Sequence, residues 1–346
     1  MLYCYKRTFD VHINFCHGGG PGMDTENKMD LEHFLMVKAA WYYYIEDYTQ
    51  QTISQLLGVS RGKVIALLER ARQTGLIQFS IRSDSDRRMS MEQEMARRFH
   101  LKDVFLVPAE QTLDNPKESI AQAAAMYILH RAEDGAYINI GYGDTTSRVL
   151  NHLATAAERP LNVVSMTGGV NYYLPTDHPS NVFNARLYLT PSPLLLSSAE
   201  LRDAMAQEPD VREVSRMVPL SSMSVVGIGH MGEDATIIHS GVLTKNDFTV
   251  LKMQGAVGDI LSHFLDETGK AVAPNLESRL MSTPLEQLKK LKNVIGVAGG
   301  LEKVEVILAV LQGGYLDVLI TDERTAQALL ERSNHMANVT WGGDQP

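Results

Sequence analysis

Glycine-rich segments recur at three places in the chain, each directly after a short apolar run. These segments are Gly141-Tyr142-Gly143-Asp144-Thr145-Thr146, Thr167-Gly168-Gly169 and Gly227-Ile228-Gly229. Glycine lets backbone amides approach an anion closely, and a helix that starts in such a loop adds a favourable dipole. The hydroxyls of Thr145, Thr146 and Thr167 add hydrogen-bond donors. These residues are suited to binding a phosphate group.

These loops do not match the known nucleotide-binding motifs. The chain has no lysine-containing P-loop, and Gly141-x-Gly143 lacks the third glycine of the dinucleotide fingerprint. ATP and NAD are therefore disfavoured, and no cofactor is expected. A single glycine at a strand end often makes only a tight turn, so the phosphate hypothesis depends on three such loops meeting in one sheet.

Two charged residues extend this candidate site. Asp259 follows Gly258 and precedes an apolar run, where a carboxylate is costly to bury without partners. Asp259 either accepts hydrogen bonds from sugar hydroxyls or caps the start of a helix. Lys303 lies one turn into the helix expected after Gly299-Gly300, where it either reaches a phosphate or is simply solvated.

Histidine and tyrosine side chains near these loops are weaker candidates. His230, His239 and His263 show no metal-ligand spacing, so they are expected to be structural, and no metal is expected. Tyr172 and Tyr173 follow the second glycine loop and either cover a ligand or pack beneath a lid.

A second kind of chemistry is indicated near the N-terminus, where residues 48–71 read as a helix-turn-helix. Apolar residues recur at helical spacing on both sides of Gly58, and Ser60 is placed to cap the second helix. Such a pair of helices positions the second one to enter the DNA major groove. The candidate DNA contacts lie on the two helices and their caps: Thr49, Gln50, Ser60, Arg61, Gly62, Lys63 and Arg70.

Charge is distributed unevenly along the chain. The net charge is −9, yet the stretch from Arg61 to Arg88 carries seven basic and three acidic residues, leaving −13 for the rest. A local basic face on an acidic body suits a protein that touches DNA phosphates at one end only. Charge alone would favour a solvated helix face, and its coincidence with the helix-turn-helix favours DNA.

The elements that must position these residues fall into an α/β chain with two functional parts. We expect a tail or upstream extension over 1–28, a helix-turn-helix domain over 29–83, a linker or oligomerisation helix within 84–101, an effector domain over 102–333 and a tail over 334–346. The apolar stretch 76–82 alternates with period two, as expected for a wing or for the first strand of a linker. In the effector domain, short apolar strands alternate with helices, which predicts a doubly wound, mostly parallel sheet.

Composition excludes several other classes of protein. No apolar run is long enough to span a membrane, and two cysteines cannot frame a disulfide-rich fold. A reducing cytoplasm is therefore the expected location.

The motifs in this order resemble those of the SorC/DeoR-type sugar-binding transcriptional regulators of bacteria, from about Met36 to Leu330. The resemblance is carried by the helix-turn-helix, the three glycine loops and four further segments: Gly255-Ala256-Val257-Gly258-Asp259-Ile260, Gly296-Val297-Ala298-Gly299-Gly300, Lys303 and Gly313-Gly314-Tyr315. It implies an effector domain similar to sugar-phosphate isomerases and deaminases, a phosphorylated sugar or polyol as effector, and a homotetramer built from dimers. It further implies that the glycine loops with Thr145 and Thr167 hold phosphate, that Asp259 binds hydroxyls and that Lys303 completes the anion site.

The resemblance therefore predicts a regulator of a carbohydrate or polyol operon, with a repressor favoured over an activator. The alternative is a sugar-phosphate isomerase or deaminase fused to a DNA-binding module. Such an enzyme needs a general base, and Asp259 or Asp144 would be available. No second acid–base partner occurs at a convincing spacing, so the enzyme ranks lower.

Overall fold

The computed structural model describes residues 10–13, 26–44, 46–74, 76–80, 83–108, 116–169, 184–233 and 235–340. The chain divides into two compact units, Met1–Arg87 and Arg88–Pro346, and each is described by itself. No helix in these described ranges is long and apolar enough to cross a membrane.

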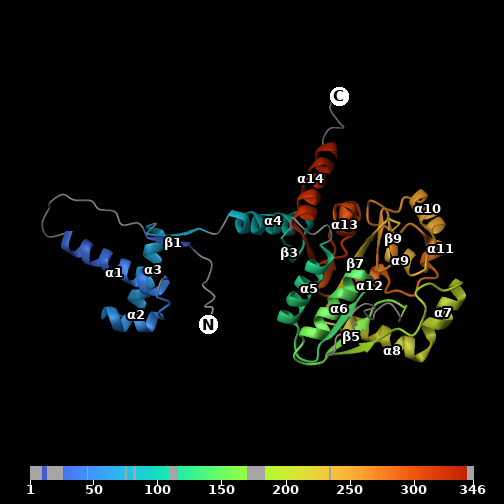
Figure 1. Cartoon of the computed structure of the whole chain (residues 1–346), viewed down its shortest axis with the longest axis horizontal. Helices are drawn as coiled ribbons and strands as arrows, with labels where there is room; N and C mark the ends of the chain where they lie inside the picture. The colour runs from blue at the N-terminus through green and yellow to red at the C-terminus, as the bar shows by residue number, and fades with distance from the viewer. Residues whose placement is uncertain are drawn as a thin grey trace. The chain divides into compact units, whose positions relative to one another are not determined.

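The first unit is a three-helix bundle made of α1 (Glu26–Tyr44), α2 (Gln50–Leu57) and α3 (Arg61–Gln73) (Figure 1). Gly58 ends α2 in the left-handed conformation that the turn requires, which glycine adopts at little cost. Ser60 caps α3 by accepting from the Lys63 amide. Ile53 is fully buried in the bundle core, whereas Leu56, another of the apolar residues before Gly58, is exposed.

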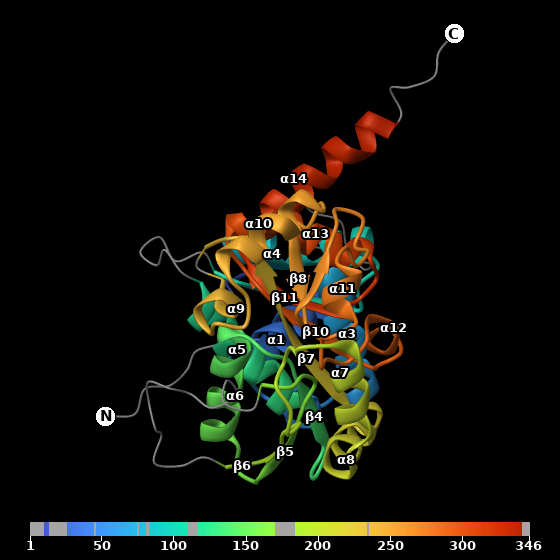
Figure 2. The same ribbon diagram turned by 90° about the vertical axis from the view of Figure 1, so that its right-hand side faces the viewer.

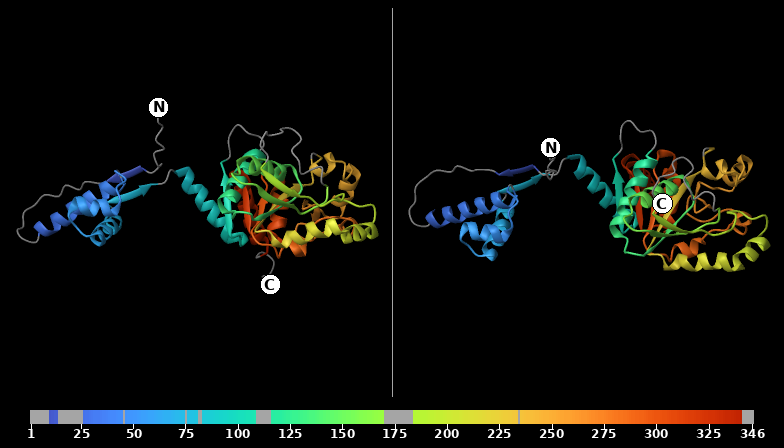
Figure 3. Two further views of the ribbon diagram at one scale, coloured as in Figure 1. Left: turned by 90° about the horizontal axis from the view of Figure 1, so that it is seen from below. Right: turned by 60° about the horizontal axis from the view of Figure 1, so that its bottom comes forward.

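A short antiparallel ribbon accompanies the bundle. Strand β2 (Ile77–Ser80) lies within the stretch whose alternation predicts a strand, and it pairs with β1 (Asp10–Ile13), as Figure 3 shows. Strand β1 and the start of α1 both fall inside residues 1–28, which were expected to form only a tail or extension. Local sequence could not predict β1, because its partner lies more than sixty residues away in the chain.

The second unit is built on a sheet whose central path runs β3-β11-β10-β7-β4-β5-β6, with every neighbouring pair on it parallel (Figure 2). Its strands are β3 (Asp103–Val107), β4 (Tyr137–Ile140), β5 (Leu161–Ser165), β6 (Ala185–Tyr188), β7 (Met223–His230), β10 (Val294–Val297) and β11 (Val318–Asp322). A short hairpin, β8 (Gly258–Ile260) and β9 (His263–Leu265), joins the sheet antiparallel to β7. The predicted mostly parallel sheet is confirmed.

Helices cover both faces of this sheet. On one face, α5 (Lys117–Arg131) and α6 (Asp144–Ala156) pack on side chains such as Ile295 and Ile320. On the other, α4 (Ser83–Phe99), α13 (Val304–Gln312) and α14 (Glu323–Thr340) pack on Val294 and Leu319. Adjacent strand residues thus enter opposite cores, which makes the sheet buried on both sides and doubly wound.

Smaller elements surround the strand ends. They are α7 (Ala199–Gln207), α8 (Pro209–Met217), η2 (Val218–Leu220), α9 (Thr236–His239), α10 (Lys245–Met253), α11 (Pro274–Glu277), α12 (Leu285–Leu288) and η3 (Leu301–Lys303). Helix α14 continues to Thr340, beyond the start of the tail expected at residue 334.

Candidate functional site

A cavity of about 60 Å³ lies where the chain leaves the carboxyl ends of β4, β7 and β10. Strands β4 and β7 are neighbours, but the chain continues from β4 toward β5 and from β7 toward β10, on opposite sides. Ligands of doubly wound sheets bind at such a switch point. Polar side chains and glycines line the cavity, among them Lys117, Tyr142, Gly143, Asp144, Thr145, Gly227, Gly229, His230, Asp259 and Lys303.

The first glycine loop places a helix N-terminus at this cavity. Gly143 precedes α6 with a φ of 141° and offers no side-chain cap, so the first amides of a 13-residue helix remain available. Thr145 lines the cavity, but the hydroxyl of Thr146 is turned back to donate to the Gly143 carbonyl at 2.9 Å. Gly141 packs closely against Leu261, because a Cβ there would lie 2.7 Å from the Leu261 Cδ2 atom.

Lys303 is the most unusual group in the site. It ends η3 and is only 7% exposed, and its ammonium group forms neither an ion pair nor a hydrogen bond with any described residue. Burial lowers the pKa of its ammonium group, and the positive charge of Lys117 lowers it further. A buried cation without a direct partner is costly, and a bound anion would offset that cost.

Asp259 lies in strand β8 and not at a helix terminus, so its alternative interpretation as a helix cap is wrong. The carboxylate accepts a hydrogen bond from the Ser262 amide at 3.0 Å and lies over Gly229, where an added Cβ would be 2.1 Å from Oδ1. Burial raises the pKa of Asp259 to about 6, although the Ser262 amide and the Lys303 charge act in the opposite direction.

The turn that Asp259 holds is strained. Leu261 and Ser262 connect β8 to β9 with φ values of 52° and 66°, a conformation that a bulky residue such as leucine rarely adopts. The Leu261 carbonyl accepts from the Ser282 hydroxyl, and the buried Ser262 hydroxyl has no partner in the described part of the chain. Strained backbone of this kind concentrates at ligand sites.

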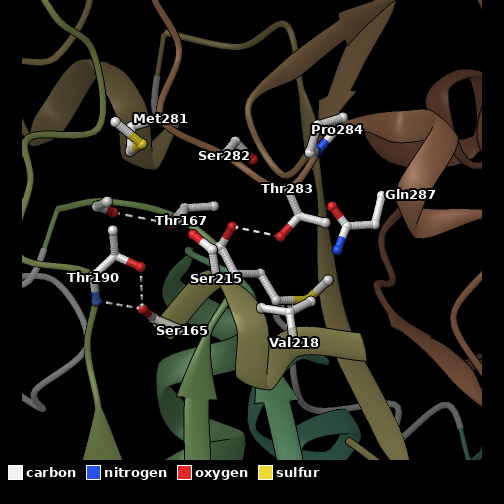
Figure 4. A pocket seen from close by; sticks show the side chains of 12 residues that line it. Ser165, Thr167, Thr190, Ser215, Val218, Met281, Ser282, Thr283, Pro284 and Gln287 are labelled. Carbon is white, nitrogen blue, oxygen red and sulfur yellow. Dashed lines mark hydrogen bonds between the residues drawn. The ribbon is translucent and has the colours of Figure 1, made fainter. Parts of the chain in front are cut away.

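The second glycine loop contributes to a different cavity, of about 70 Å³, shown in Figure 4. Thr167 and Gly168 line it with Ser165, Thr190, Ser215 and Thr283, and none of the described residues lining it is charged. The Thr167 hydroxyl donates to the Gly168 carbonyl. Gly168 is required for packing, since a Cβ there would lie 2.4 Å from the Pro193 carbonyl oxygen, while the Gly169 amide donates to the Ser192 carbonyl.

The predicted effector residues are therefore divided between two cavities. Tyr142, Gly143, Thr145, Asp259 and Lys303 line the cavity with charged groups, while Thr167 and Gly168 line the uncharged one. Gly169 and Thr146 line neither cavity. Tyr172 and Tyr173 lie outside the described residues.

Two residues that line the charged cavity were not predicted from the sequence to be part of the site. Lys117, at the start of α5, was not singled out; its ammonium group lies 3.2 Å from the Asp144 carboxylate. His230, expected to be structural, lines the cavity at the end of β7. Gly227 and Gly229 precede His230, and they could have indicated that His230 lies at the site. Nothing in the local sequence marks Lys117.

In the first unit, the predicted DNA contacts have different surroundings. Arg61 and Gly62 are exposed at the start of α3, and Arg61 forms no ion pair with any described residue. The hydroxyls of Thr49 and Ser60 accept from backbone amides as helix caps, and Gln50 begins α2.

Lys63 and Arg70 are engaged within the bundle by Glu32 of α1. Their nitrogens lie 2.8 and 3.1 Å from the two Glu32 carboxylate oxygens. The hydrogen bond from Lys63, with the charges of Lys63 and Arg70, lowers the pKa of Glu32. Two of the basic candidates thus already have an acidic partner.

Comparison with known proteins identifies the class of this chain. A protein-family model described as "Putative sugar-binding domain" matches residues 84–331. The transcriptional regulator LsrR of Enterobacter sp. (strain 638) is 34% identical over 304 residues, covering 86% of this chain and 93% of that protein. LsrR of Escherichia coli O139:H28 is 32% identical, covering 85% and 94%.

Solved structures agree. The full-length sorbitol operon regulator SorC from Klebsiella pneumoniae superposes with a TM-score of 0.61 at 26% identity, covering 87% of this chain and 99% of that one. A DeoR family transcriptional regulator from Listeria monocytogenes, at 20% identity and a TM-score of 0.61, covers 70% of this chain and 99% of its own and shares the fold.

The fold and these matches define a transcriptional regulator with a sugar-binding domain. The chain belongs to the family of SorC/DeoR-type sugar-binding transcriptional regulators, as its motifs predicted. Its relatives are regulators and not enzymes, so the alternative of a sugar-phosphate isomerase or deaminase is not supported.

Proposed function

We propose that this protein represses a carbohydrate or polyol catabolic operon and that a phosphorylated sugar or polyol, bound in the Lys303 cavity, controls its affinity for the operator. The observation that carries the proposal is the buried Lys303 ammonium, which has no ion-pair partner in the described structure and borders a cavity. A phosphate is the metabolite group best suited to that position, because it brings two negative charges and several acceptor oxygens.

The rest of the cavity favours a ligand with both a phosphate and hydroxyl groups. Lys303, Lys117, the Thr145 hydroxyl and the N-terminus of α6 form the part suited to the phosphate. Asp259 is an acceptor suited to sugar hydroxyls. None of the described residues that line the cavity at Thr167 and Gly168 is a cation, so we assign the phosphate to the Lys303 cavity alone.

For the first unit, we propose that α1–α3 and the β1–β2 ribbon form a winged helix-turn-helix that binds double-stranded operator DNA in the cytoplasm. Arg61, Gly62 and Ser60 at the start of α3 would lie nearest the base edges, with Thr49, Gln50, Lys63 and Arg70 flanking them. A homotetramer built as a dimer of dimers would present pairs of these helices to symmetric half-sites.

Calorimetric titration of the full-length chain tests the ligand class. Phosphorylated sugars and polyols are compared with their unphosphorylated forms, using wild type, Lys303→Met and the exposed-lysine control Lys292→Met. We expect binding of a phosphorylated member only, weakened at least about tenfold in Lys303→Met, because a charge-assisted pair is lost.

The Lys292→Met variant should bind as wild type does, since this lysine is exposed and does not line the cavity. Equal affinity for phosphorylated and unphosphorylated ligands, or unchanged binding by Lys303→Met, would refute the proposal.

A further inference from the structure

The loop that carries Lys303 is fixed to α14 by one backbone amide. The Gly300 amide donates to the Thr325 hydroxyl oxygen at 2.8 Å and to Asp322 Oδ2 at 3.2 Å. Gly300 is followed directly by η3, which ends at Lys303. The position of Lys303 therefore depends on Asp322 and Thr325, at the start of α14.

This anchor is buried and tightly packed. Thr325 is fully buried and Asp322 is 4% exposed, and Thr325 donates both its amide and its hydroxyl to the Asp322 carboxylate. A Cβ on Gly299 would lie 2.4 Å from Asp322 Oδ2. A closely packed, fully hydrogen-bonded group transmits small shifts because it has no space to absorb them.

Glu323, which directly follows Asp322, connects the start of α14 to α4. Its carboxylate pairs with Arg88 at 2.6 Å, with both side chains about 30% exposed. Helix α4 begins at Ser83, within the first compact unit, and ends at Phe99, with Met95 buried in the core of the second. It is the helix through which the chain passes from one unit to the other.

We propose that Asp322, Thr325, Glu323 and Arg88 are positioning residues that couple the Lys303 loop to α4 and, through it, to the DNA-binding unit. What fills the cavity rests on the proposed function, but the coupling itself is a property of the ligand-free chain. An anion that draws Lys303 and its loop inward pulls on the Gly300 amide, and the buried Asp322–Thr325 pair passes the displacement to the neighbouring Glu323–Arg88 ion pair.

Hydrogen–deuterium exchange of the full-length chain, without ligand or DNA, tests this coupling from both ends. The variants are Arg88→Met at the α4 end and Thr325→Val at the loop end. Arg98→Met is the matched control: Arg98 is also on α4 and also binds α14, but far along it, through the Leu330 carbonyl and the Ser333 hydroxyl. Thr325→Ser keeps the hydroxyl and serves as the conservative rescue.

We expect Arg88→Met to speed exchange of the 298–303 amides roughly threefold, a change on the scale of one half-exposed ion pair, while Arg98→Met leaves them unchanged. Thr325→Val should speed exchange over 84–91 to a similar degree, and Thr325→Ser should not. Coupling free energies are reciprocal, so both directions must respond.

The proposal is overturned if Arg88→Met leaves residues 298–303 at wild-type rates, or if Arg98→Met affects them equally. It is also overturned if Thr325→Val changes only its own surroundings. Since no ligand is used, these outcomes are independent of the calorimetric titration that tests the proposed function.

Discussion

At the scale of single residues, Asp259 combines a raised pKa with a place in the ligand cavity. Its carboxylate is held by one amide, that of Ser262, and is otherwise surrounded by groups that desolvate it. Its pKa of about 6 means that it changes charge within the range in which cells and buffers vary.

The raised pKa of Asp259 predicts how the free energy of unfolding changes with pH. Because the pKa of Asp259 is higher in the folded chain than the usual aspartate value of 3.8, its ionised form is the disfavoured one in the fold. Relative to Asp259→Asn, wild type should therefore lose stability as the pH rises from about 4 through 6. A shift of this size corresponds to roughly 3 kcal/mol of unfolding free energy. Urea unfolding of both proteins at pH 4.5 and 7.5 measures the difference, and a pH-independent difference would contradict it.

Ligand binding should show the opposite dependence. Hydroxyl donors bind the carboxylate more strongly than the protonated acid, so wild-type affinity should fall as the pH drops below 6. The phosphate itself also titrates near this pH. Asp259→Asn separates the two effects, since only the phosphate contribution remains in that variant.

At the scale of elements, the contact between α1 and α3 holds two of the proposed DNA-contact residues. Glu32 on α1 holds Lys63 and Arg70, which lie two turns apart on the same side of α3. Phosphates of the operator must compete with this carboxylate for the two cations.

Glu32→Gln should therefore tighten operator binding, by roughly two- to fivefold, the scale of exposed ion pairs. It should also make the affinity fall more steeply with salt, because more cationic charge is free to replace counterions. Fluorescence anisotropy over a range of salt concentrations measures both quantities. Glu69→Gln on α3 is the control, because Glu69 forms an ion pair only with Arg72 among the described residues. Weaker binding by Glu32→Gln would mean that Lys63 and Arg70 need Glu32 to be positioned for DNA.

The elements also show what sequence can and cannot predict here. Strands such as β4 and β10 were predictable because apolar runs ended by glycine leave few other interpretations. The β8–β9 hairpin was not, since its strands have three residues each and its turn is Leu261-Ser262 and not the usual Asn-Gly. The apolar residues after Asp259 therefore also fitted the start of a helix, with Asp259 as its N-cap.

The residue types of the candidate site could be predicted from the sequence, but which of these residues share a cavity could not. Gly143, Thr145, Asp259 and Lys303 were all foreseen, and the structure brings them to one cavity. Which loops become neighbours depends on strand order, and β4 lies between β7 and β5, so Thr167 at the end of β5 faces a separate cavity. Lys117 and Glu32 were missed because their partners are remote in the sequence.

At the scale of the whole molecule, the proposed regulator consists of a DNA-binding unit, an effector unit and the helix α4, which spans their boundary. Effector binding must favour one of two states that differ in operator affinity, and typical coupling of this kind changes affinity by about five- to 150-fold. The buried Lys303 is placed to respond to an anion, and the Gly300 anchor is placed to pass that response to α4.

The most direct test is the affinity of the full-length chain for a DNA fragment selected by its own binding, measured by anisotropy with and without the phosphorylated sugar that binds in the calorimeter. For a repressor, the account predicts at least about tenfold weaker DNA binding when wild type is saturated with this ligand. Lys303→Met should bind the same DNA but show no such change. DNA affinity that is unaffected by the bound sugar phosphate, or a Lys303→Met variant that responds fully, would contradict it.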